Sequence, residues 1–122
     1  MALLESGEMY LETILVLASR GKTVRAIDIS EYMGFSKPSV SRALSRLREE
    51  GYVTVNETGA IDFTEAGRAV AEKIYARHTL LTDLLEKLGV SPETAREDAC
   101  RIEHDISDET FEALKQHIKS HE

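Results

Sequence analysis

The chain has 122 residues, which fits one ordinary domain or two small modules that share a core, because single domains most often have about 100 to 150 residues. Apolar residues make up 42% of the sequence and charged residues 30%, which excludes intrinsic disorder, and the longest aliphatic run, residues 14–18, is far shorter than the roughly 20 residues of a membrane-spanning helix. The single cysteine cannot form an internal disulfide and no signal-peptide pattern is present, so we expect a cytoplasmic protein with no membrane partner.

The net charge of −7 argues against nucleic-acid binding on average, but the charge is unevenly distributed. Residues 1–75 carry 9 basic and 11 acidic side chains, a net −2, whereas residues 76–122 carry 6 and 11, a net −5. Residues 36–48 contain four basic side chains and no acidic one. Because DNA affinity depends on charge close to the phosphates, this basic segment is a candidate nucleic-acid contact.

Apolar residues at helical spacing predict the first helix, over about residues 4–19: Leu4, Leu11, Leu15 and Ala18. A second helix is expected from a cap at Thr23 through Met33, because Gly34 follows in the position typical of a helix end.

The segment "FSKPSVSRALSRLREEG" predicts a third helix, which begins after an N-cap at Ser36 and ends near Gly51. Its apolar positions share one face: Val40, Leu44 and Leu47. Two short helices joined by a turn that contains glycine indicate a helix-turn-helix.

The segment "YVTVNETGAIDF" that follows predicts a wing, with strands at about residues 52–55 and 60–63 around a turn at Thr58 and Gly59. A long helix is expected after Thr64, with an apolar stripe: Val70, Ile74, Leu81 and Leu85. Two further helices are expected: Ser91 opens one that runs to about residue 105, and Ser107 opens one that runs to about residue 119. The expected fold is therefore mostly α, with an N-terminal winged helix-turn-helix domain at 1–63 and a helical domain at 64–122.

With its apolar face turned inward, the third helix presents the opposite face to solvent at 100° per residue. We expect this face to enter a DNA groove, because a preceding helix and a following wing complete the winged helix-turn-helix pattern. Ser36 and Pro38 would meet base edges, and Arg42 would meet guanine. The full set of expected DNA contacts is Ser36, Lys37, Pro38, Ser39, Arg42, Arg46 and Arg48.

The stretch "ACRIEHD" places Cys100, Glu103 and His104 at i, i+3 and i+4, so a thiolate, a carboxylate and an imidazole can converge on one metal ion. Met9 and Glu12 likewise project from the first helix, away from its apolar stripe. A structural interpretation stays open: a buried thiol beside a surface ion pair, a gap-filling Met9 and a solvated Glu12. His78 lies within the stripe of the long helix, where a hydrogen-bonded core histidine is usual.

These residues together resemble the diphtheria toxin repressor family of metal-dependent transcriptional regulators, close to its short manganese-regulator branch. The resemblance covers nearly the whole chain and rests on "EMYLETI", "SKPSVSRALSRLREEGYV", "FTEAGR", "RHTLLTDLL" and "EDACRIEHDISDE". It implies a winged helix, a helical dimerisation region without the SH3-like domain of longer members, and a site for Fe(II) or Mn(II).

By position, the resemblance implies an iron-branch corepressor site of Met9, Cys100, Glu103 and His104. It also implies that Glu12 and His78 match ligands of the two-metal site in the manganese branch. The chain is therefore expected to be a metal-dependent repressor that binds double-stranded operator DNA as a homodimer, with Fe(II) preferred over Mn(II).

Two alternatives stay open beside this expectation. One is a winged-helix module that acts without metal. The other is an enzyme with a mononuclear metal, which is disfavoured because no nucleophile, phosphate loop or second acid-base pair accompanies the candidate ligands.

Overall fold

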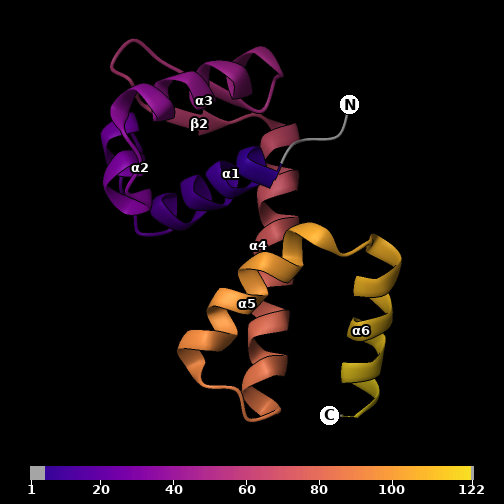
Figure 1. Ribbon diagram of the computed structural model, residues 1–122. Helices are drawn as coiled ribbons and strands as arrows, with labels where there is room; N and C mark the ends of the chain where they lie inside the picture. The colour runs from indigo at the N-terminus through magenta and orange to yellow at the C-terminus, as the bar shows by residue number, and fades with distance from the viewer. Residues whose placement is uncertain (1–4, 122) are drawn as a thin grey trace. The chain divides into compact units, whose positions relative to one another are not determined.

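The computed structural model describes residues 5–121, whose secondary structure is drawn in Figure 1. They form two compact units, here called unit 1, which ends at Glu72, and unit 2, which begins at Lys73. The elements, in chain order, are α1 (Glu5–Ala18), α2 (Ala26–Met33), α3 (Lys37–Glu49), β1 (Val53–Val55), β2 (Ile61–Phe63), α4 (Glu65–Lys87), α5 (Pro92–Asp105) and α6 (Asp108–Ser120). The expected mostly helical fold with an N-terminal winged helix-turn-helix is confirmed. The division between units falls inside α4, and the domain boundary between residues 63 and 64 stays a prediction.

Within residues 5–121, no helix combines the length and the apolar character that a membrane span needs.

The buried face of α1 differs in part from the predicted stripe. Leu11 is fully buried as expected, but Ala18 is exposed and Leu15 is only half-buried. The residues that α1 adds to the core are Tyr10, Leu11, Ile14 and Leu17. The predicted stripe took the positions four and seven residues after Leu11, whereas the structure buries the positions three and six residues after it, Ile14 and Leu17. Leu4 lies outside the described residues.

Helix α2 begins later than predicted, because Thr23 is not its cap. Val24 instead forms a β-bridge to Ile61, whose backbone N–H donates to the Val24 carbonyl at 2.8 Å. Arg25 is the N-cap residue, and its backbone N–H donates to Asp28 Oδ2 at 2.9 Å. The segment before α2 therefore extends the small sheet of the wing.

The predicted form of α3 is confirmed. The Ser36 side chain accepts a hydrogen bond from the backbone N–H of Ser39 at 3.3 Å, which satisfies one of the free donors at the helix start. Val40, Leu44 and Leu47 are all buried in the core of unit 1. This burial fixes which face of α3 meets solvent.

The wing is an antiparallel pair in which Val53 lies opposite Phe63. Asn56 shapes its turn, because its side-chain Oδ1 accepts hydrogen bonds from the backbone N–H groups of Thr58 and Ala60, both at 2.9 Å. The wing meets the first turns of α4 closely. A Cβ atom on Gly67 would lie 1.9 Å from the Tyr52 carbonyl oxygen, so only glycine fits there.

Unit 2 contains α5 and α6 and the part of α4 that follows Glu72. Ser91 and Ser107 cap α5 and α6, as predicted from the sequence. The buried hydrophobic residues of the unit are Ile74, Leu81, Ala95, Ala99 and Phe111. The charged residues Arg77 and Glu103 are buried among them, at 5% and 0% exposure.

Candidate metal centre and nucleic-acid interface

The solvent-facing side of α3 carries the residues predicted to contact DNA. Six of the seven are exposed: Ser36, Lys37, Pro38, Arg42, Arg46 and Arg48. Ser39 is half-buried, and its Oγ accepts hydrogen bonds from Ser36 Oγ at 2.9 Å and Arg42 Nη2 at 3.4 Å. Ser39 therefore orients Arg42 at the start of the helix. No acidic side chain occurs between the first and the last of these residues.

A groove of about 360 Å³ in unit 1 lies between α2, α3 and the wing, and its charged lining residues are Arg25 and Arg48. Two serines of α3, Ser41 and Ser45, add hydroxyl groups. The Arg25 Nε–H donates to the Thr58 carbonyl at 3.2 Å, which ties α2 to the tip of the wing. The role of Arg25 could not be predicted from the sequence, because its partner lies 33 residues away and only the folded chain brings the two together.

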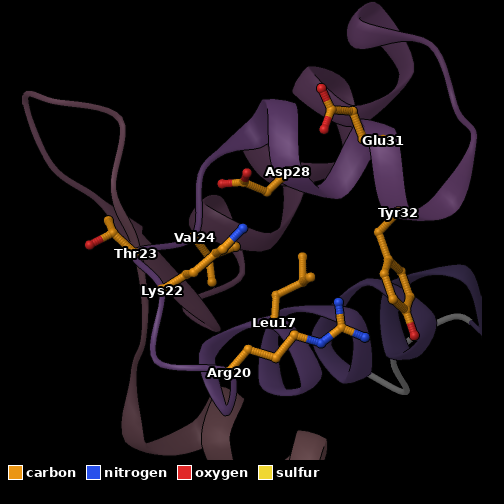
Figure 2. Close-up of a pocket in the computed structure, with 8 residues that line it drawn as sticks. All are labelled: Leu17, Arg20, Lys22, Thr23, Val24, Asp28, Glu31 and Tyr32. Atoms are coloured by element: carbon orange, nitrogen blue, oxygen red, sulfur yellow. The ribbon is translucent and has the colours of Figure 1, made fainter.

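The pocket in Figure 2 has a different character from this groove. It has a volume of about 250 Å³ and lies between the end of α1, the segment that joins α1 to α2, and α2 itself. Its lining combines the cations Arg20 and Lys22 with the carboxylates Asp28 and Glu31. The Arg20 guanidinium lies over the Tyr32 ring, 5.4 Å from its centroid. This pocket therefore has charges of both signs, whereas the charged residues that line the groove are both arginines.

In unit 2, the structure brings together the three predicted ligands of α5. The ligand atoms of Cys100, Glu103 and His104 all lie within 4.8 Å of one another. The Glu103 carboxylate is fully buried, and its Oε1 lies 3.4 Å from His104 Nε2. The alternative of a surface ion pair beside the thiol is therefore wrong, because neither the Glu103 nor the His104 side chain is exposed.

His78 reaches the same carboxylate from α4. Its Nδ1–H donates to Glu103 Oε2 at 2.9 Å, and 25% of the His78 side chain is exposed. Two imidazoles thus approach one carboxylate, each at a different oxygen. This contact fits both interpretations of His78, as a hydrogen-bonded histidine and as part of a metal site, because carboxylates commonly orient the imidazoles around an ion.

Arg77, the neighbour of His78 on α4, holds the backbone around Glu103. Its Nη1 donates to the carbonyl oxygens of Glu103 at 3.2 Å and Ile106 at 3.3 Å, and its Nη2 pairs with Asp108 at the start of α6. The guanidinium also lies over the Phe111 ring, 5.1 Å from the centroid. Consecutive α4 residues therefore fix the main chain and the side chain of Glu103. The role of Arg77 could not be predicted from the sequence, because a single arginine in a helix is usually solvated.

The chemistry of this cluster fits a divalent cation. Glu103 Oε1 is buried and accepts no hydrogen bond within the described part of the chain. Such an oxygen raises the free energy of the fold unless a donor or a cation meets it. A thiolate, a carboxylate and an imidazole together suit Fe(II), Co(II), Ni(II) or Zn(II), and the oxygen and nitrogen atoms also accept Mn(II). Met9 and Glu12 lie half-buried on α1 in unit 1, and their part in this centre stays a prediction.

Comparison with known proteins agrees with both parts of this description. Residues 64–122 match the family model described as iron dependent repressor, metal binding and dimerisation domain. Residues 2–61 match the model described as iron dependent repressor, N-terminal DNA binding domain. The chain belongs to the iron-dependent repressor family. The family's metal-binding and dimerisation domain corresponds to α4 to α6, and its DNA-binding domain corresponds to α1 to the start of β2.

Individual members of the iron-dependent repressor family align along most of the chain. The transcriptional regulator MntR of Escherichia coli is 33% identical over 112 residues, which cover 92% of this chain and 72% of MntR. The diphtheria toxin repressor of Corynebacterium diphtheriae is 33% identical over 118 residues, which cover 96% of this chain and 52% of the repressor. The solved structure of the manganese regulator SloR superposes with a TM-score of 0.81 at 28% identity, over 93% of this chain and 53% of SloR. The chain thus spans about half the length of the last two.

Proposed function

We propose that this protein is a metal-dependent transcriptional repressor that binds operator DNA as a homodimer. The observation that carries the proposal is the buried Glu103 carboxylate, which meets a thiol and two imidazoles in the region that matches the family's metal-binding domain. The exposed basic face of α3 lies in the region that matches the DNA-binding domain. One chain therefore carries a site for an effector and a surface for DNA.

The proposed DNA contacts are of two kinds, contacts to base edges and contacts to phosphates. Ser36 and Pro38 at the start of α3 would meet base edges. Arg42, oriented by Ser39, would donate two hydrogen bonds from its guanidinium group to guanine. Lys37, Arg46 and Arg48 would meet phosphates. In a homodimer, the α3 helices of the two subunits would have to be about 34 Å apart, which is one turn of the double helix.

We propose Fe(II) as the ion, with Mn(II) as the second candidate. The Cys100 sulfur favours Fe(II) because soft ligands bind iron better than manganese, whereas Glu103 and His104 accept either ion. The similarity to SloR, a manganese regulator, supports Mn(II) as the second candidate. When bound, the ion would supply the positive charge that the buried carboxylate lacks.

Regulation follows if Met9 and Glu12 on α1 contribute to the same centre, as the family resemblance implies. Metal bound by all of these ligands would then favour one arrangement of the two winged helix-turn-helix domains in the homodimer. An effector shifts such an equilibrium only by its difference in affinity for the two arrangements, so the DNA-competent arrangement must have the complete ligand set.

The test combines selection of DNA with metal control. Duplexes are selected from a random pool with Fe(II) under anaerobic conditions, and separately with Mn(II), and their binding is then measured by fluorescence anisotropy with and without EDTA. We expect EDTA to abolish binding, and we expect Glu103→Gln to do the same in the presence of metal. Glu97→Gln, which changes an exposed carboxylate on the same helix, is the matched control. Binding that survives both EDTA and Glu103→Gln would refute metal control and favour the metal-independent module.

A further inference from the structure

The C-terminal end of α6 carries a pair of histidines that the proposed function does not use: His117 lies in the last turn and His121 is the C-cap residue. His117 and His121 are four residues apart, so their side chains lie on the same face of the helix. Both are exposed, and their ring centroids are 4.1 Å apart with 31° between the ring planes. Two imidazoles at this spacing on a helix are a recognised chelating arrangement for transition metals.

The hydrogen bond of His121 sets which of its ring nitrogens is available. His121 Nδ1 lies 2.9 Å from the backbone carbonyl oxygen of His117. Because a carbonyl can only accept, Nδ1 donates, and the neutral ring then has its lone pair on Nε2. Metal-bound histidines generally make this kind of contact, with one nitrogen held by a carbonyl and the other on the ion.

The electrostatic setting at this helix end favours a cation. The final carbonyl groups of a helix lack intrahelical donors and give its C-terminal end a partial negative charge. Lys119 lies between the two histidines in sequence, but at 100° per residue it projects about 200° around the helix from His117. Its ammonium group therefore leaves the face of the imidazole pair open.

We propose that His117 and His121 form a second metal site, a two-imidazole chelate for Ni(II), Cu(II) or Zn(II). Metal–nitrogen bonds of about 2.0–2.1 Å place the two ligating atoms about 3 Å apart. Rings with centroids 4.1 Å apart reach this geometry by small rotations, which exposed side chains make freely. Water fills the remaining coordination positions. Mn(II) binds poorly here, because it prefers oxygen ligands.

The test is calorimetric titration of the tag-free protein with Ni(II) in the Glu103→Gln background, which disables the centre on α5. We expect one Ni(II) per chain there, lost in both His117→Gln and His121→Gln because the chelate needs both rings. Lys119→Gln is the matched control and should retain the ion. Circular dichroism checks that each variant keeps its helix content. Ni(II) binding that persists after either histidine is replaced, or no binding in the Glu103→Gln background, would overturn the proposal. Neither result bears on the α5 centre, which is tested in the wild-type chain.

Discussion

Arg77→Met removes the buried guanidinium of unit 2 but keeps most of the aliphatic stem. In the native chain this group donates to two backbone carbonyls at the end of α5, at 3.2 Å and 3.3 Å. A hydrogen bond from a charged donor contributes roughly 1.5–3 kcal/mol, so the loss of both should lower the free energy of unfolding by at least about 3 kcal/mol. For a chain of this size that corresponds to a fall of roughly 10 °C in melting temperature.

The assay is urea denaturation followed by circular dichroism, with Lys73→Met as the matched control. Lys73 Nζ also pairs with Asp108, at 2.9 Å, but both side chains are more than half exposed. Exposed ion pairs contribute little, so the control should shift the urea midpoint only slightly. The affinity for metal should also fall in Arg77→Met alone, because Arg77 holds the backbone of Glu103. If Arg77→Met were no less stable than Lys73→Met, the assigned role of the guanidinium would be wrong.

Three further predictions concern other parts of the chain. Gly67→Ala should destabilise unit 1 by about 2 kcal/mol or more, measured by thermal denaturation, because the new Cβ would collide with the Tyr52 carbonyl oxygen. The hydrogen bond from Lys73 lowers the pKa of Asp108 below its ordinary 3.8, so Asp108 contributes stability above that pH and loses it as the pH falls through the lowered value. Asp108→Asn should therefore lower the urea midpoint at pH 7, because Asp108 pairs with the buried Arg77 as well as with the exposed Lys73, and the difference from wild type should shrink at pH 3. Arg42→Ala should relax base preference in the selected duplexes, whereas unchanged selectivity would remove Arg42 from base recognition.

The helix boundaries that depend on local chemistry could be predicted from the sequence. Ser36, Ser91 and Ser107 cap their helices where expected, because each side chain interacts with a backbone group only three residues away. The start of α2 could not be predicted in this way. The pairing of Val24 with Ile61 across the fold decides it, and no local pattern records that pairing.

The candidate metal centre was likewise predictable from the sequence only in part. Cys100, Glu103 and His104 could be grouped from the sequence, because helical periodicity alone places them on one face. The burial of Glu103 and the roles of Arg77 and His78 could not be predicted. They depend on which residues of α4 meet α5, and charged side chains are buried only when such partners exist.

The most direct test of the metal centre is an anomalous difference map from a crystal of the protein grown anaerobically with Fe(II), with data collected on both sides of the iron edge. We expect a peak about 2.0–2.4 Å from Cys100 Sγ, a Glu103 carboxylate oxygen and a His104 ring nitrogen, as transition-metal bonds require. A map with no peak at these three residues, in crystals that hold iron elsewhere, would contradict the proposed centre.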